Sequence, residues 1–234
     1  MNPGFHSLWP TPLGIHRWEH AETINPLLVR VFSALRATQR HARGERGEAD
    51  KPFFASDDDL LQRIQLPEWQ AFVRFVVTSL RDTVSAANRS AWPAAATNLQ
   101  VAIEGLWFQT SSRGAFQDVH THGNCSWSGV YCVQVDDDAA RCTHPTYGAS
   151  NGVTRFYGPP FAQLGGAHVD LGNAYLQPPH VDVPPLPGQL VVFPSWLAHQ
   201  ALPYGGECDR VVVSFNASVH AAAGGDRLHG YSAT

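Results

Sequence analysis

From Asn98 onward, the sequence is a succession of short runs rich in valine and aromatic residues, separated by clusters of glycine, proline, asparagine and aspartate. β-Branched and aromatic side chains favour strands, and the residues between the runs favour turns. The expected strands are residues 99–110, 115–120, 127–135, 153–157, 168–176, 180–183, 189–193 and 210–219. Because eight such strands suit a double-sheet jelly roll, we predict a mainly β core at residues 98–220.

The amino-terminal part of the chain follows a helical pattern instead. Apolar residues recur at helical spacing over residues 23–43, with Thr23 as the expected N-cap. A second helix is expected after a Ser56 cap, and a third over residues 67–87. We therefore expect a single domain over residues 1–234, in which residues 1–97 form a helical region that packs on the β core.

Three histidines form a candidate metal site. His120 and His122 are two residues apart on an extended segment, so their side chains are expected on the same face. A later strand that returned His199 to this face would complete one side of a metal's coordination sphere and leave other positions open. Asp118, which shares the strand face of His120, or a water molecule could take the third position in place of His122.

Arg210 opens an apolar strand eleven residues after His199. A guanidinium at an inward-facing position could clamp the carboxylate of an acidic co-substrate beside the metal. Ser214 and Asn216 lie on the same strand face as Arg210 by the two-residue period, so we expect both in the same pocket. The competing interpretation is an ordinary ion pair with an acidic residue of the preceding turn.

These motifs resemble the iron(II)- and 2-oxoglutarate-dependent oxygenases, in particular a branch with the patterns H-x-H, S-G-V-Y, F-P-S-W-L-x-H and R-x-x-x-S-F-N. The matching stretches are residues 120–122, 128–131, 193–199 and 210–216. The resemblance implies a cupin-like double-stranded β-helix with iron at its mouth. It further implies that His120 and His199 bind the iron and that Arg210 binds the distal carboxylate of 2-oxoglutarate.

The sequence departs from the family pattern at two positions. The broader superfamily has His-x-Asp, whereas His122 stands at the carboxylate position, which should raise the potential of the iron and weaken the hold on ferrous iron. In prolyl-hydroxylase-like enzymes, a tyrosine at the position of Cys132 helps to bind 2-oxoglutarate, and a thiol is a shorter and weaker donor. Since Tyr131 is expected to point to the opposite face, the clamp depends more heavily on Arg210.

The activity that the resemblance implies is oxidation of a C–H bond of an organic substrate by O2 and 2-oxoglutarate, with release of succinate and CO2. Hydroxylation is the expected outcome, and desaturation and rearrangement are variants of the same chemistry. The loops at residues 136–152 and 159–164 are expected to line the mouth and select the substrate. Two alternatives stand beside this activity: a three-histidine cupin-type dioxygenase that does not use 2-oxoglutarate, and a noncatalytic jelly-roll binding module.

Charge and composition restrict the partners. The formal charge is −4 and no block of lysine and arginine occurs, so nucleic acid is not an expected partner. No apolar run approaches the roughly 20 residues that a membrane-spanning helix needs, and the first residues lack the pattern of a signal peptide. We expect a cytoplasmic enzyme with a small-molecule substrate, and a homodimer is compatible with the sequence.

Overall fold

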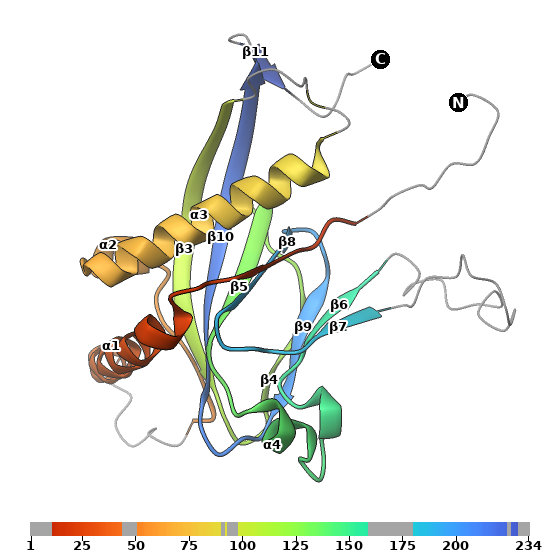
Figure 1. The fold of residues 1–234 in the computed structure, drawn as a ribbon. Helices are drawn as coiled ribbons and strands as arrows, with labels where there is room; N and C mark the ends of the chain where they lie inside the picture. Colours follow the sequence, from red (N-terminus) through yellow and green to blue (C-terminus); the bar gives the residue numbers. More distant parts are fainter. Residues whose placement is uncertain are drawn as a thin grey trace, which may run out of the picture.

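The computed structural model describes residues 11–43, 51–89, 92, 98–158, 180–223 and 226–228. Within these residues, the chain forms two antiparallel sheets with helices against the larger one (Figure 1). The mainly β jelly roll with a helical layer that the sequence predicts is therefore confirmed. The predicted strand at residues 168–176 lies outside the described residues.

The larger sheet has seven strands in the described part of the chain. In order across the sheet these are β1 (Gly14–Arg17), β8 (Gln189–Pro194), β5 (Trp127–Gln134), β10 (Arg210–Ala223), β3 (Asn98–Ser111) and β2 (Phe53–Ala55), and β11 (Asp226–Leu228) extends the sheet by pairing with the end of β10. The long β10 and β3 form the centre, paired from Arg210 opposite Ser111 to Ala222 opposite Asn98. This ladder fixes which side chains share a face.

The smaller sheet contains, in order, β4 (Ala115–His120), β9 (His199–Tyr204), β6 (Thr154–Tyr157) and β7 (His180–Val183). One end of the β4–β9 ladder pairs His120 with His199, and the other end pairs Ala115 with Tyr204. We refer to the first as the histidine end of the barrel. Arg210 begins β10 towards the opposite end, because β3 and β4 are joined by the short turn that follows Ser111.

Two long helices, α1 (Ala21–Ala42) and α3 (Pro67–Ala87), lie across the larger sheet (Figure 1). Their apolar faces bury side chains of the sheet: Phe32 of α1 stacks on Phe108 of β3, with ring centroids 4.6 Å apart. Tyr131 of β5 points to this side and donates a hydrogen bond of 2.8 Å to Asn25 of α1. Its predicted orientation, away from the inner face of the barrel, is confirmed. No helix in the described ranges is long and apolar enough to span a bilayer.

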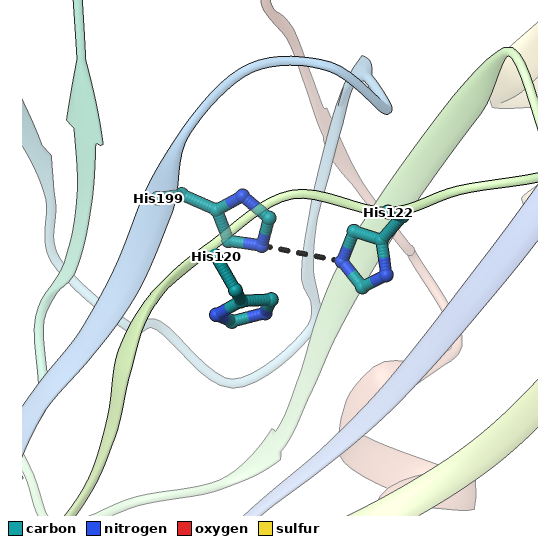
Figure 2. A group of neighbouring side chains, drawn as sticks. All are labelled: His120, His122 and His199. Carbon is teal, nitrogen blue, oxygen red and sulfur yellow. Dashed lines mark hydrogen bonds between the residues drawn. The ribbon is translucent and has the colours of Figure 1, made fainter.

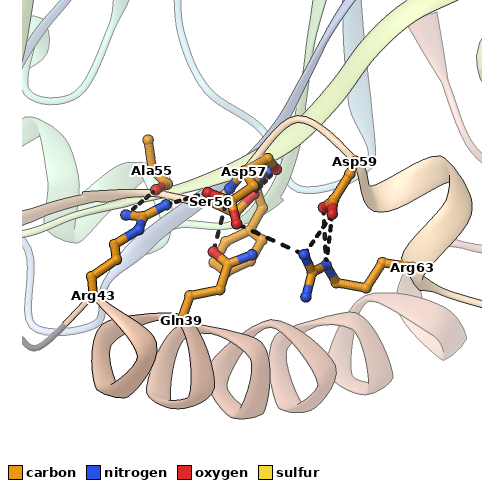
Figure 3. A network of polar contacts seen from close by, with 8 residues as sticks. Gln39, Arg43, Ala55, Ser56, Asp57, Asp59 and Arg63 are labelled. Atoms are coloured by element: carbon orange, nitrogen blue, oxygen red, sulfur yellow. Dashed lines mark hydrogen bonds and ion pairs between the residues drawn. The ribbon is translucent and has the colours of Figure 1, made fainter.

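The helix starts differ from the predictions in two places. The N-cap of α1 is His20, so Thr23 lies inside the helix. The short α2 (Leu60–Arg63) begins after Asp59, and the hydroxyl of Ser56 instead donates to the carbonyl of Asp57 and accepts from the N–H of Phe108. Ser56 therefore ties the segment to the sheet. Three further polar side chains, those of Arg43, Asp57 and Arg63, link this segment to the end of α1 (Figure 3).

Several strands were not expected from the sequence. β1 and β2 belong to residues 1–97, which are thus not helical throughout, and each is only three or four residues long. β9 contains Pro203 and its residues show no regular alternation of apolar and polar types. Short strands of this kind are specified by their neighbours in the sheet more than by their own composition. Two short helices were also not expected. These are α4 (Asp138–Cys142) and the 3-10 helix η1 (Gly148–Ser150), and both lie within a segment that was predicted to be a loop.

Candidate metal centre and co-substrate pocket

The fold brings together the three histidines that the sequence singled out. His120 ends β4, His199 begins β9, and the two residues are partners in the β4–β9 ladder. His122 lies two residues beyond β4, where its backbone N–H donates a hydrogen bond of 2.9 Å to the carbonyl of Ser195. This bond anchors the connection so that the third imidazole turns back towards the other two, as Figure 2 shows.

The spacing of the imidazoles suits a single ion. One nitrogen from each ring can be chosen so that all three lie within 4.8 Å of one another. The Nε2 atoms of His122 and His199 are 3.3 Å apart. Two nitrogens bound at about 2.1 Å on neighbouring positions of one metal would lie about 3 Å apart. The residues present therefore fit a metal held by three imidazoles.

Backbone contacts orient two of the rings for this role. Nδ1 of His199 lies 2.8 Å from the carbonyl of Leu197, and Nδ1 of His120 lies 2.7 Å from the carbonyl of Asp118. Since a carbonyl only accepts, each Nδ1 carries the proton and each Nε2 presents its lone pair. Burial lowers the pKa of His199 to about 4 and also lowers the pKa of His122, so both rings stay neutral.

The alternative ligand Asp118 does not join the cluster. Its side chain is exposed, and its contribution to the site is the backbone carbonyl that holds His120. Among the described residues, the group that could hold a metal consists of imidazoles alone. The geometry therefore favours His122 over Asp118 as the third ligand.

Arg210 is a buried cation that has no anionic partner among the described residues. Its side chain is only 4% exposed, and its one hydrogen bond in the described part of the chain runs 3.4 Å from Nη2 to Oγ1 of Thr154. Its Nε has no hydrogen-bond partner there. The neighbouring Asp209 pairs instead with Arg36 at 3.0 Å. A buried unpaired charge is costly, which indicates that this guanidinium binds an anion from outside the chain.

The histidines and Arg210 line the same cavity, between the inner faces of the two sheets. Its wall is formed by Trp107, Gln109, Gln117, His120, His122, Gly129, Val130, Thr154, Phe193, His199, Ala201, Arg210, Ser214 and Phe215. Apart from the histidines, Arg210 is the only ionisable residue among the described residues of this wall. The cavity thus offers a metal position at one end and a positively charged anchor at the other.

The remaining predicted residues take different places. Ser214 is buried and lines the cavity, as expected. Asn216 is not part of the wall, and its carboxamide oxygen accepts a hydrogen bond of 2.8 Å from Ser128. Cys132 is buried and lines a second small cavity, which it shares with Arg210.

Sequence reasoning missed three polar residues of the wall, namely Gln109, Gln117 and Thr154. None of them belongs to a metal or carboxylate-binding motif. The available signal was strand alternation: Gln109 shares the inner face of β3 with Trp107, and the registers of β3 and β10 place this face beside Arg210 and Ser214. Alternation alone does not tell which face of β3 lines the cavity. That requires knowledge of the strand that pairs with β3, which cannot be derived from the sequence.

The loop at residues 136–152 lies at the wrong end of the barrel for the role expected of it. β5 leads into this loop, and its last residue Gln134 pairs with Val211 beside Arg210. At the far end of the loop, a Cβ on Gly152 would lie 3.5 Å from Cδ of Arg210. The loop therefore closes the Arg210 end, and the prediction that it lines the mouth next to the metal is wrong. The predicted loop at 159–164 lies outside the described residues.

Comparisons with known proteins agree with this arrangement. Residues 105–216, just under half of the chain, match the family described as "Putative 2OG-Fe(II) oxygenase". The matched segment contains the three histidines and Arg210. No curated protein sequence matches the chain.

Two solved structures are similar over most of their length. One is HygX from Streptomyces hygroscopicus, with nickel and 2-oxoglutarate bound, which is 11% identical with a TM-score of 0.51. The match covers 89% of this chain and 82% of the HygX chain. A prolyl hydroxylase from Trichoplax adhaerens, in complex with a peptide fragment of hypoxia inducible factor, is 8% identical with a TM-score of 0.51, covering 89% and 84%. At such identities the likeness establishes the fold.

Proposed function

We propose that this chain, of which residues 105–216 match the 2OG-Fe(II) oxygenase family, hydroxylates a C–H bond of a small organic substrate and releases succinate and CO2. One observation carries the proposal: Arg210, a buried guanidinium without an anionic partner in the described ranges, lines the same cavity as three converging histidines. A metal site alone would not require this cation. A co-substrate that binds the metal at one end and carries a carboxylate at the other accounts for both.

His120, His122 and His199 would hold the iron through their Nε2 atoms. Three neutral ligands occupy one face of the coordination sphere and leave positions for other molecules. When bound, the iron supplies with O2 and 2-oxoglutarate the oxidising chemistry that the side chains lack. The contribution of the histidines is to hold the ion at a fixed place in the cavity wall.

Arg210 would bind the distal carboxylate of 2-oxoglutarate, because a guanidinium presents a fork of donors that matches a carboxylate. Oγ1 of Thr154 accepts from Arg210, so its hydroxyl proton is left to donate to the same carboxylate. Ser214 lines the path from Arg210 to the histidines and offers a further hydroxyl. Asn216 stays a predicted contact, supported by its position on the strand face of Arg210.

Aromatic residues shield the metal position from water. Phe193 packs on the ring of His199 with centroids 4.6 Å apart, and Phe156 lies 5.8 Å from the same ring. This apolar support fixes the imidazole and keeps the local environment dry, which strengthens charged interactions within the cavity. The substrate would enter from the histidine end, because the loop at residues 136–152 closes the other end.

The shared core supports the proposal that residues 1–234 act as one domain. Phe32 and Trp69 of the helices belong to the same buried cluster as Phe108 and Tyr131 of the larger sheet. Removal of the amino-terminal helices would expose this cluster to water. We therefore assign the helical layer a stabilising role and place the chemistry in the barrel.

Anaerobic calorimetry of the whole chain with ferrous iron, followed by 2-oxoglutarate, tests the proposed function. We expect one iron and one 2-oxoglutarate per chain, and succinate formation when air is admitted. O2 consumption that needs iron but not 2-oxoglutarate would point instead to a three-histidine dioxygenase. A chain that binds neither ligand would be a noncatalytic binding module.

A further inference from the structure

Gln109 places a carboxamide in the cavity wall. The residue is 7% exposed and lines the cavity that contains the histidines and Arg210. No side-chain hydrogen bond of Gln109 forms within the described ranges of the chain. Its carboxamide atoms are not among the fully buried side-chain atoms that lack a partner, so they are reached through the cavity. The donor and the acceptor of this group are therefore available to a molecule that enters the cavity from outside.

The strand register places this carboxamide along the path of the proposed co-substrate. Gln109 of β3 lies directly opposite Val212 of β10. Val212 is two residues from Arg210 and two from Ser214, and all three side chains share the inner face. The carboxamide thus lies between the level of Arg210, which would bind the distal carboxylate, and the level of Ser214, nearer to the histidines.

Across β10 from Gln109, the equivalent place is taken by a thiol. Cys132 of β5 lies opposite the same Val212, so Gln109 and Cys132 flank this part of β10 from its two sides. The sulfur of Cys132 lies 3.9 Å from the carbonyl of Gln134, and burial raises the pKa of the thiol to about 12. A neutral thiol is a weak donor. Of the two flanking side chains, only Gln109 can supply a strong hydrogen bond.

The charge of the cavity indicates which carboxamide atom is used. In the part of the wall that the structure describes, Arg210 is the only formally charged residue, and its charge favours an anion at its end of the cavity. A carboxylate only accepts hydrogen bonds, so it would be met by the NH2 group of Gln109 and not by the carboxamide oxygen. A charge-assisted hydrogen bond of this type is stronger than one between neutral groups.

We propose, resting on the proposed function, that Gln109 is a co-substrate-binding residue whose NH2 group donates a hydrogen bond to the distal carboxylate of 2-oxoglutarate beside Arg210. This contact compensates for the weak donor at Cys132. The carboxylate would then contact three side chains, those of Arg210, Thr154 and Gln109, and β3 contributes the last of these. The binding site for the co-substrate is then formed by strands of both sheets.

The test is calorimetric titration of 2-oxoglutarate into the zinc-loaded full-length protein, in which the redox-inactive zinc prevents turnover. Replacement of Gln109 by leucine (Gln109→Leu) removes the donor and keeps most of the volume. Loss of a hydrogen bond to a charged group should weaken binding by roughly tenfold or more. Gln109→Met, which keeps the length of the side chain, should give the same loss and serves if the leucine variant does not fold.

Gln100→Leu is the matched control, because Gln100 is a second carboxamide on β3 that is exposed and is not part of the cavity wall. We expect its affinity for 2-oxoglutarate to stay within about twofold of the wild type, since Gln100 lies opposite His220, far along the ladder from Arg210. An equal loss in both variants would reflect a general effect of leucine on β3 and would overturn the assignment. Unchanged affinity in both Gln109 variants would overturn it as well.

A truncated ligand identifies the end of the co-substrate that Gln109 contacts. 2-Oxobutyrate keeps the keto acid and lacks the distal carboxylate, so its affinity should be equal in the wild type and in Gln109→Leu. A loss for 2-oxobutyrate as large as that for 2-oxoglutarate would place Gln109 at the metal end and contradict the proposal. If the wild type itself binds no 2-oxoglutarate, the proposed function fails, and the inference about Gln109 fails with it.

Discussion

His120 and His199 face each other across the ladder of β4 and β9, and the centroids of their rings are 4.4 Å apart. The two residues are 79 positions apart in the sequence, so the pairing of the two strands creates the site. The proposed ion site is therefore a property of the folded barrel. Any change that alters the register of β4 against β9 should separate the two rings.

The first prediction concerns the third ligand. His122→Ala should weaken the binding of ferrous iron by more than tenfold, because it removes one of three donor nitrogens from the cluster. Asp118→Asn should leave iron affinity nearly unchanged, since the exposed carboxylate lies outside the cluster and its backbone carbonyl stays in place. Anaerobic titration of both variants checks this. The opposite order of affinities would make Asp118 the ligand.

The second prediction concerns the anion clamp. Arg210→Ala should weaken 2-oxoglutarate binding more than tenfold, because a hydrogen-bonded charge contact contributes on the order of 1.5 to 3 kcal/mol. Metal content should stay close to that of the wild type, since Arg210 does not belong to the histidine cluster. Calorimetry and metal analysis on the same preparation measure both quantities. Co-substrate affinity equal to that of the wild type would remove the role assigned to Arg210.

The motifs and the general fold could be predicted from the sequence, because their signals are local. The H-x-H pair begins at the end of a predicted strand, and Arg210 opens a run of valines that is typical of a buried strand. The choice between His122 and Asp118 as the third ligand could not be made from the neighbouring sequence alone. It depends on the turn after His120 and on the bond from His122 to Ser195, a residue far away in the sequence.

The end of the barrel at which each loop lies also could not be predicted from the sequence. The loop at residues 136–152 has the polar composition of a binding loop, but β5 carries it to the end occupied by Arg210. β9 was missed because its residues do not alternate regularly. The role proposed for Gln109 could not be inferred from the sequence, because a glutamine in a strand carries no motif and its position is informative only once its partner across the ladder is known.

The third prediction concerns Gly129, which lies in the S-G-V-Y motif and lines the cavity. A Cβ at this position would clash with the ring of Phe215 and would lie 2.9 Å from the carbonyl of Val191. Gly129→Ala should therefore destabilise the fold by about 1 to 3 kcal/mol through overpacking. Urea unfolding measures this. Gly123→Ala, where a Cβ would meet nothing within 4 Å, is the control and should cost less.

The fourth prediction concerns the pH dependence of the β6–β7 pair. Arg155 donates two hydrogen bonds, of 2.7 and 2.8 Å, to the carboxylate of Asp182 on the neighbouring strand. These bonds lower the pKa of Asp182. The stabilisation should be fully present above the ordinary pKa of an aspartate, about 3.9, and should be lost as the pH falls below it through the depressed value.

Acid titration of unfolding free energy in the wild type and in Asp182→Asn checks this prediction. The variant cannot ionise at this position, so the difference in stability between the two proteins should be constant at neutral pH and should shrink in acid. A difference that is independent of pH down to the acid unfolding transition would contradict the assigned ion pair.

The most direct test of the central claim is the affinity of the full chain for 2-oxoglutarate with and without ferrous iron, measured anaerobically in the wild type and in His199→Ala. If the three histidines and Arg210 form one site, the wild type binds one 2-oxoglutarate per chain with an affinity that rises at least tenfold when iron is present, and His199→Ala loses this gain. Affinity that is the same with and without iron, or that survives intact in His199→Ala, would show that the metal and the co-substrate do not meet in this cavity.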